Sequence, residues 1–108
     1  MKVLKFRDYL VPLVLERKKT STWRLFDDKS LAADDKIQLY EFGKDIPFGN
    51  AKITKVIEKL FADLTVADKE GHEVFSTDDE MYKTYSEYYK TPVGPSTTLK
   101  IIWFELII

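Results

Sequence analysis

Residues 19–24 combine, in the order Lys-Thr-Ser-Thr-Trp-Arg, most of the side-chain types that could act on a ligand. The ammonium of Lys19 and the guanidinium of Arg24, with Lys18 just upstream, could hold a phosphate group. The indole of Trp23 could stack on a nucleobase. The pattern indicates a site for a nucleoside or RNA, and its purely structural alternative is a strand with an inward indole and a basic entry turn.

The hydroxyl groups of the same segment also allow nucleophilic catalysis. A lysine that burial keeps deprotonated can act as the base for a serine or threonine, as in Ser–Lys catalytic pairs. Lys19 lies next to three such hydroxyls. The sequence therefore supports a hydroxyl nucleophile as well as a phosphate contact.

A second cluster, at residues 68–73, contains three carboxylates and the only histidine of the chain. Glu73 could act as a general acid–base, and His72 could bind a polar edge of a ligand. A divalent metal bound by Asp68, Glu70 and Glu73 is a further interpretation. A solvated acidic loop ahead of a helix explains the same residues without any function.

Four tyrosines, at positions 82, 85, 88 and 89, recur at helical spacing downstream of this cluster. Such a stripe could stack on nucleobases. Helical aromatic stripes are more often core, with one or two hydroxyls reaching a polar partner. Core packing is the interpretation that the spacing favours.

The composition of the 108-residue chain excludes several classes of site. With no cysteine, disulfides, thiolate-bound zinc, iron–sulfur clusters and a cysteine nucleophile are excluded, and a reducing cytoplasm is the expected location. With one histidine, one subunit cannot build a three-histidine or HExxH zinc site. We expect no cofactor and no bound metal.

Charge is distributed unevenly along the sequence. Residues 1–60 carry 13 Lys and Arg against 9 Asp and Glu, whereas residues 61–108 carry 4 against 9. A basic face could contact phosphates, but a net charge of −1 suits a small nucleoside better than duplex RNA.

The longest apolar stretch, residues 101–108, is broken by Glu105 and is shorter than the ~20 residues that span a bilayer. We expect no membrane partner, and a monomer is favoured.

Alternation, helical spacing and turn residues predict the elements that position these side chains. Strands are expected at residues 2–6, 20–25, 36–42, 51–60 and 97–107, helices at 9–17 and after the capping box at 77–80, a turn at 43–50 and a short helical or turn segment at 63–71. A bulge is expected near Val56. In the second strand, Lys19, Ser21 and Trp23 would face one way, and alternate residues the other.

This order of elements predicts an α+β protein. Short connections favour a small mixed β-barrel flanked by two or three helices over a doubly wound parallel sheet. A dinucleotide-binding fold is excluded because no glycine-rich turn joins a strand to a helix. At this length we expect a single domain, residues 1–108.

Several segments, taken in order, resemble the activating-signal-cointegrator homology (ASCH) family. They are Val11-Pro12 with Leu15, residues 19–24, residues 70–73 and the closing segment 101–106, and together they extend over nearly the whole chain. The resemblance implies a β-barrel similar to the PUA domain of RNA-modifying enzymes. It also implies a cleft beside the barrel that suits RNA or a modified nucleoside.

The family's hallmark, Gly-x-Lys-x-x-Glu-x-Arg, aligns with residues 17–24. Two positions depart from it, because Arg17 replaces the glycine and Thr22 replaces the glutamate. The resulting Lys-Thr-x-Thr-x-Arg is similar to small bacterial ASCH enzymes that hydrolyse N4-acetylcytidine to cytidine. By that resemblance Lys19 activates Thr22, Thr22 attacks the acetyl carbonyl, and a glutamate moves protons.

Counting back from the capping-box helix favours Glu73 as that glutamate, with Glu70 second. The resemblance further implies a set of binding residues around the reacting groups: Lys18, Ser21, Trp23, Arg24, Glu70 and His72. Other family members are ribonucleases or RNA-binding modules. RNA binding without catalysis and RNA cleavage in the same cleft therefore stay as alternative functions.

Overall fold

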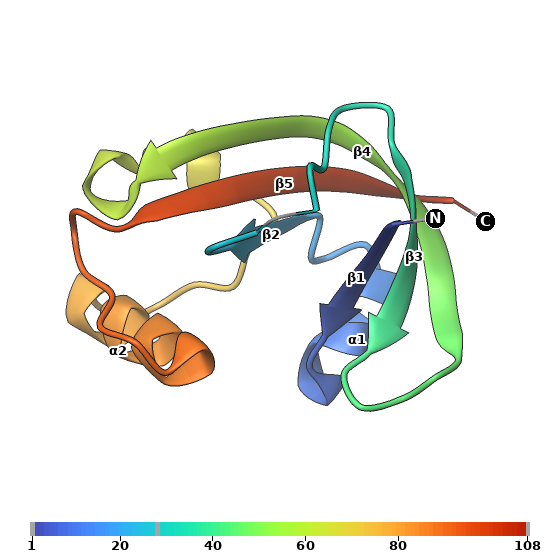
Figure 1. Cartoon of the computed structure of the whole chain (residues 1–108), viewed down its shortest axis with the longest axis horizontal. Coiled ribbons are helices and arrows are strands. Elements are labelled where there is room, and N and C mark those ends of the chain that lie inside the picture. Colours follow the sequence, from blue (N-terminus) through green and yellow to red (C-terminus); the bar gives the residue numbers. More distant parts are fainter. Residues whose placement is uncertain (1, 28, 108) are drawn as a thin grey trace.

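A computed structural model describes residues 2–27 and 29–107, and in that part of the chain five strands form one curled sheet (Figure 1). The strands are β1 (Lys2–Phe6), β2 (Ser21–Arg24), β3 (Lys36–Glu41), β4 (Pro47–Leu60) and β5 (Thr98–Ile107). The α-helices are α1 (Val11–Leu15) and α2 (Asp78–Tyr89), and single 3₁₀ turns lie at Asp8–Leu10, Phe61–Asp63 and Ala67–Lys69.

The strand order is β1-β3-β4-β5-β2. Among the described strands only the β1–β3 pair is parallel, and the other pairs are antiparallel. The long strands β4 and β5 form the spine of the sheet, and Figure 1 shows α1 and α2 on its concave side near opposite ends. The predicted α+β class is confirmed: the molecule is a curled half-barrel with two short helices.

Two hydrophobic cores fill the concave side. The aliphatic core lies under β1, β3 and one end of β4; its buried residues include Leu4, Val14, Ile37, Leu39 and Ile53. The aromatic core lies between the other half of the sheet and α2; its buried residues include Trp23, Phe61, Met81, Tyr85 and Ile101.

The aromatic helix forms as its sequence predicts. The Oγ1 of Thr77 accepts a hydrogen bond from the backbone N–H of Glu80 at 3.1 Å, which caps the first turn. The helix ends at Lys90, whose φ of 52° is left-handed. Tyr85 is buried, so core packing, which the helical spacing favoured, is confirmed for that residue.

Other predicted boundaries are wrong by a few residues. The turn predicted at 43–50 is shorter, because β4 begins at Pro47; proline is tolerated at the first residue of a strand. The register shift in β4 lies between Ile53 and Lys55, slightly before the predicted Val56. The helix predicted at 9–17 is a 3₁₀ turn followed by the five residues of α1.

Candidate functional site

The entry to β2 is built by the end of α1. Arg17 adopts a left-handed φ of 61°, which reverses the chain. The backbone N–H groups of Lys18 and Lys19 then both donate to the carbonyl of Leu13, at 2.9 and 3.0 Å. This turn directs the Lys19 side chain inward, where only 3 % of it is exposed.

The loop at 70–73 is docked against β2 by a glycine. The carbonyl of Gly71 accepts hydrogen bonds from the backbone N–H groups of Thr20 and Ser21, at 2.8 and 3.2 Å. Gly71 has a φ of 75°, and a Cβ atom there would lie 1.9 Å from the Thr20 Oγ1. Only glycine fits such a conformation and approach, and the docking brings His72 and Glu73 to the start of β2.

Lys19 and Glu73 form a tight ion pair, with 2.5 Å between Nζ and Oε2. Burial lowers the pKa of the Lys19 ammonium, although the charge and hydrogen bond of Glu73 act to raise it. Burial alone would raise the pKa of the Glu73 carboxyl, but the charges of His72 and Lys19 and the bond from Lys19 bring it below its usual value. The two residues are therefore an ion pair of partly desolvated groups.

His72 is fixed on both sides of its ring. Its Nδ1 lies 3.1 Å from the Glu73 carbonyl, and its Nε2 lies 3.1 Å from the Tyr85 hydroxyl. A carbonyl only accepts, so Nδ1 carries the proton and Nε2 accepts from the tyrosine. Burial, followed by the nearby Lys19 charge, lowers the pKa of His72 to about 4, so the ring is neutral at pH 7.

The indole of Trp23 stacks on this imidazole, with 3.8 Å between ring centroids and 12° between planes. Tyr85 stacks on Trp23 as well, at 5.9 Å and 27°. The indole N–H is buried without an acceptor among the described residues. Trp23 thus helps to hold His72 in place.

Thr22 and Arg24 are two residues apart in β2, and their side chains contact each other on the same side of the strand. The Nε of Arg24 donates to the Thr22 Oγ1 at 3.1 Å, and its Nη2 donates to the carbonyl of Lys5 at 2.8 Å. Burial is the main cause that lowers the pKa of the Arg24 guanidinium. Thr22 is 4 % exposed, so its hydroxyl lies in a largely desolvated position.

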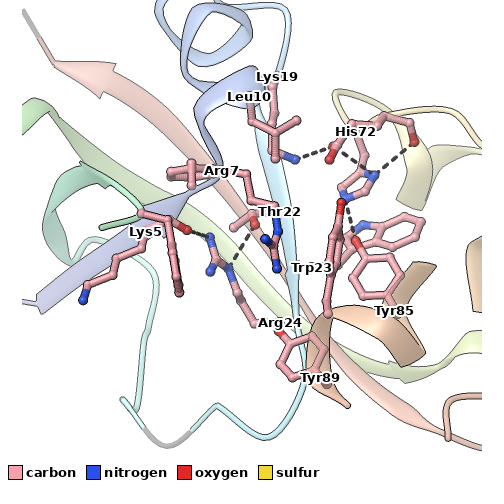
Figure 2. Close-up of a pocket in the computed structure, with 14 residues that line it drawn as sticks. Lys5, Arg7, Leu10, Lys19, Thr22, Trp23, Arg24, His72, Tyr85 and Tyr89 are labelled. Carbon is pink, nitrogen blue, oxygen red and sulfur yellow. Dashed lines mark hydrogen bonds and ion pairs between the residues drawn. The ribbon is translucent and has the colours of Figure 1, made fainter. Parts of the chain in front are cut away.

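These groups line one cavity of about 230 Å³ (Figure 2). It contains six of the predicted site residues: Lys19, Thr22, Trp23, Arg24, His72 and Glu73. The remaining lining residues come from β1 and the turn after it, from the end of β3 and from α2: Lys5, Phe6, Arg7, Leu10, Phe42, Tyr85, Tyr88 and Tyr89.

Three predicted binding residues lie outside this lining. The side chain of Lys18 is 71 % exposed and pairs with Glu16 at 3.2 Å. Ser21 is buried, and its hydroxyl lies 3.3 Å from the backbone carbonyl of Glu70. The Glu70 side chain is exposed, so Glu73 is the glutamate that faces Lys19.

The carboxylates proposed for a metal are also separated. Asp68 accepts from Lys59 at 2.6 Å and from the backbone N–H of Thr65 at 2.9 Å, whereas Glu73 pairs with Lys19. Within residues 2–27 and 29–107, no three His, Asp or Glu side chains gather in a metal-binding group. Asp68 acts instead as a structural anchor for the 65–68 turn.

Sequence reasoning missed two cavity residues at the ends of β1 and β3, Arg7 and Phe42. Arg7 directly follows β1, and its guanidinium carbon lies 4.3 Å from the ring centroid of Tyr88 and 5.8 Å from that of Phe42. No local pattern marks Arg7 or Phe42. They meet because β1 pairs in parallel with β3, with Phe6 opposite Glu41 at the ends of both strands.

Comparison with known proteins shows which solved structures this fold resembles. No protein-family model matches the chain, and no curated protein matches it either. A protein of Enterococcus faecalis V583 is similar in structure, with a TM-score of 0.79 at 18 % identity, covering 98 % of this chain and 79 % of its own. An ASCH domain from Lactobacillus crispatus JV V101 superposes with a TM-score of 0.71 at 9 % identity, covering 97 % and 79 %.

An ASCH protein from Zymomonas mobilis is also similar, with a TM-score of 0.68 at 12 % identity, covering 95 % of this chain and 65 % of its own. The chain has the ASCH-domain fold. The predicted resemblance is thereby confirmed at the level of fold, and the cavity lies inside an ASCH framework. No helix in the described part of the chain is long and apolar enough to cross a membrane.

Proposed function

We propose that this ASCH domain binds a modified nucleoside in the cavity and hydrolyses its acyl amide, as in N4-acetylcytidine. The observation that supports this most is the buried Lys19–Glu73 pair, which lines the same cavity as the hydroxyl of Thr22. A lysine, a hydroxyl and a carboxylate are together sufficient for acyl transfer without a metal. Figure 2 shows Lys19 and Thr22 directed into the shared space.

Lys19 is the base in this mechanism. It must lose its proton before it can accept one, and burial favours that loss by lowering the pKa of the ammonium. The Glu73 carboxylate, 2.5 Å away, takes this proton only transiently during the reaction, because its lowered pKa keeps it ionised at rest. Glu73 can later return it to the leaving amine, as a general acid does.

Thr22 is the nucleophile. Its oxygen accepts a hydrogen bond from the cationic Arg24, so its own proton is directed elsewhere and is free to pass to a base. The same bond stabilises negative charge as it develops on the oxygen. Arg24 thus activates Thr22 in addition to shaping the cavity.

The reaction proceeds in two balanced steps. The Thr22 oxygen bonds to the acetyl carbon, its proton passes to Lys19, and the carbon–nitrogen bond breaks as the amine nitrogen takes a proton. Water then attacks the acetyl-threonine ester and releases acetate. The sum is N4-acetylcytidine and water giving cytidine and acetate.

Aromatic side chains form the cavity walls that would contact the nucleobase of the substrate. One face of Trp23 is covered by His72, so in this proposal Trp23 positions His72 and does not stack on the substrate. Phe42, Tyr88 and Tyr89 line the cavity and are available for contact with a planar ring. Neutral His72 contributes a polar ring edge.

The test is to follow cytidine formation from N4-acetylcytidine by chromatography, with the parent protein beside Lys19→Met. We expect the variant to lose about 10²–10⁴-fold in turnover, as removal of a general base does. Lys59→Met is the matched control, because Lys59 pairs with Asp68 at 2.6 Å and lies outside the cavity lining. Equal turnover in a folded Lys19→Met protein would exclude the proposed base.

RNA binding without catalysis is the second candidate, favoured by the cationic Arg7 and Arg24 in the cavity lining. It predicts no cytidine, together with an affinity for single-stranded RNA that falls steeply as salt is added. Cleaved RNA ends in the same assay would instead indicate a ribonuclease.

A further inference from the structure

Two guanidinium groups line the cavity without a carboxylate partner. Among the described residues, the Arg7 guanidinium makes no hydrogen bond or ion pair, and Arg24 bonds only to the neutral oxygens of Thr22 and Lys5. Figure 2 shows the ends of Arg7 and Arg24 directed into the same space beside Thr22, whereas the Lys5 ammonium points away. The two cations are therefore positioned with several N–H donors still free.

Aromatic rings hold both guanidinium groups in place. The guanidinium carbon of Arg7 lies 4.3 Å from the ring centroid of Tyr88, and that of Arg24 lies 5.1 Å from that of Phe6. A guanidinium packed on a ring face keeps its edge N–H groups for other acceptors. The arrangement thus orders the donors without using them.

Nearby negative charge is already committed. Glu73, which lines the cavity, pairs with Lys19 at 2.5 Å, and Asp27, whose charge acts on Arg24, pairs with Lys100 at 3.2 Å. The low pKa of His72 leaves that ring uncharged at pH 7. The cavity therefore carries an excess of positive charge although the whole chain has a net charge of −1.

We infer that Arg7 and Arg24 bind a phosphomonoester, so that the acylated substrate is a mononucleotide and not a free nucleoside. For the identity of the nucleobase, this inference rests on the proposed function. A phosphomonoester has a second pKa of about 6 and is mostly a dianion at pH 7, which matches two guanidinium charges. Its terminal oxygens can accept hydrogen bonds from the N–H groups of both guanidinium groups.

One nucleotide fits the dimensions better than a strand of RNA does. The cavity measures about 230 Å³, just below the roughly 300–1,000 Å³ of sites for single small molecules. Sites for single-stranded nucleic acid extend as grooves over several nucleotides. We therefore assign the phosphate to a monophosphate and not to an internal position of a polymer.

The test is calorimetric titration of cytidine 5′-monophosphate and of cytidine into the parent protein, Arg7→Gln and Lys83→Gln. In the parent protein we expect the monophosphate to bind at least about tenfold more tightly, since charge-assisted hydrogen bonds are the strong ones. Arg7 is exposed, so Arg7→Gln is expected to fold, and it should lose this preference. Lys83→Gln on α2 removes the same charge outside the cavity lining and should keep it.

Equal affinities in the parent protein, or an undiminished preference in Arg7→Gln, would overturn the phosphate site. Binding of a 5′-phosphorylated RNA several-fold tighter than the monophosphate would overturn the assignment to a mononucleotide. The hydrolysis assay separates the two proposals. If the monophosphate binds through Arg7 but no acylated compound is hydrolysed, the phosphate site stands and the hydrolase fails; if N4-acetylcytidine is hydrolysed while both ligands bind equally, the reverse holds.

Discussion

The two cores of this ASCH fold differ in chemistry as much as in position. The aliphatic core is filled with buried side chains such as Leu39, Ile53 and Ile102, which have no polar atoms to satisfy. The aromatic core contains Trp23 and Tyr85, whose rings carry polar groups, and it borders the buried His72. One core is a packing unit, and the other is both a packing unit and the wall of the cavity.

The polar groups of the aromatic core organise the site. Tyr85 donates to His72, and the hydroxyl of Tyr89 accepts from the backbone N–H of Leu25 at 3.1 Å. The indole N–H of Trp23 lacks an acceptor among the described residues, and an unsatisfied buried donor costs about 1–3 kcal/mol. The difference teaches that the aromatic core buries polar groups that the aliphatic core does not have, and that at Trp23 this carries a cost in stability.

Ile53→Ala tests the aliphatic core with the largest expected effect. Ile53 is fully buried, so the truncation should lower the free energy of unfolding by about 2–5 kcal/mol through lost burial and a new cavity. Ile46→Ala, at a residue 80 % exposed, should change it by less than about 0.5 kcal/mol. Denaturant titration measures both. If the folded Ile53→Ala protein lost its affinity for the nucleotide, the separation of the two cores would be wrong.

Gly71→Ala tests the docking of the site loop. The new Cβ would collide with Thr20 and force an L residue to a φ of 75°, so we expect a loss of about 2–3 kcal/mol in unfolding free energy. Turnover should fall too, because Glu73 moves away from Lys19. In Gly43→Ala the φ is 85° but no atom lies within 4 Å of the new Cβ, so only about 1 kcal/mol should be lost. Equal losses in the two variants would contradict the close approach.

The dependence of stability on pH distinguishes the cores further. The pKa of His72 is 6.5 in its ordinary state and about 4 in the fold. Between these values the unfolded chain binds more protons than the native one, so stability rises with pH, and it is lower by about 2 kcal/mol at pH 5 than at pH 7. The lowered pKa of Glu73 also contributes stability, which is present above pH 4.5 and is lost as the pH falls further. It therefore does not contribute to the difference between pH 5 and pH 7. Urea titrations measure the unfolding free energy at both pH values, and in His72→Gln the difference of about 2 kcal/mol between pH 5 and pH 7 should disappear. A difference as large as in the parent protein would contradict a neutral His72.

Arg17→Gly carries the smallest expected effect and acts between the cores, where α1 turns toward β2. A left-handed φ of 61° costs an L residue about 1–2 kcal/mol, part of which glycine gives back as greater freedom in the unfolded chain. We expect a gain of about 0.5–1 kcal/mol in unfolding free energy. Lys18→Gly has no positive φ to relieve and should lose stability instead. A loss in both variants would show that the Arg17 side chain contributes more than its backbone costs.

At the same turn the backbone favours the glycine of the ASCH pattern that residues 17–24 resemble, and it does not explain the arginine found here. The family pattern has glycine at the position of Arg17, and the left-handed conformation there gives the physical reason for it. The hallmark was visible in the sequence, but the reason for the glycine needs the backbone angle. The choice between Glu70 and Glu73 was likewise open until the Gly71 turn directed Glu73 to Lys19.

Short-range physics determined what could be predicted from the sequence alone. The capping box at Thr77, the β-forming residues at 20–25 and the spacing of the tyrosines depend on neighbours a few residues apart, and each produced the expected element. Only the tertiary structure decided that Arg7 joins the cavity, because its place depends on the parallel pairing of β1 with β3 and on the packing of α2 at the far end of the chain. Such long-range pairing leaves no periodic mark near Arg7, and so the contribution of Arg7 to the cavity was not apparent from the order of residues.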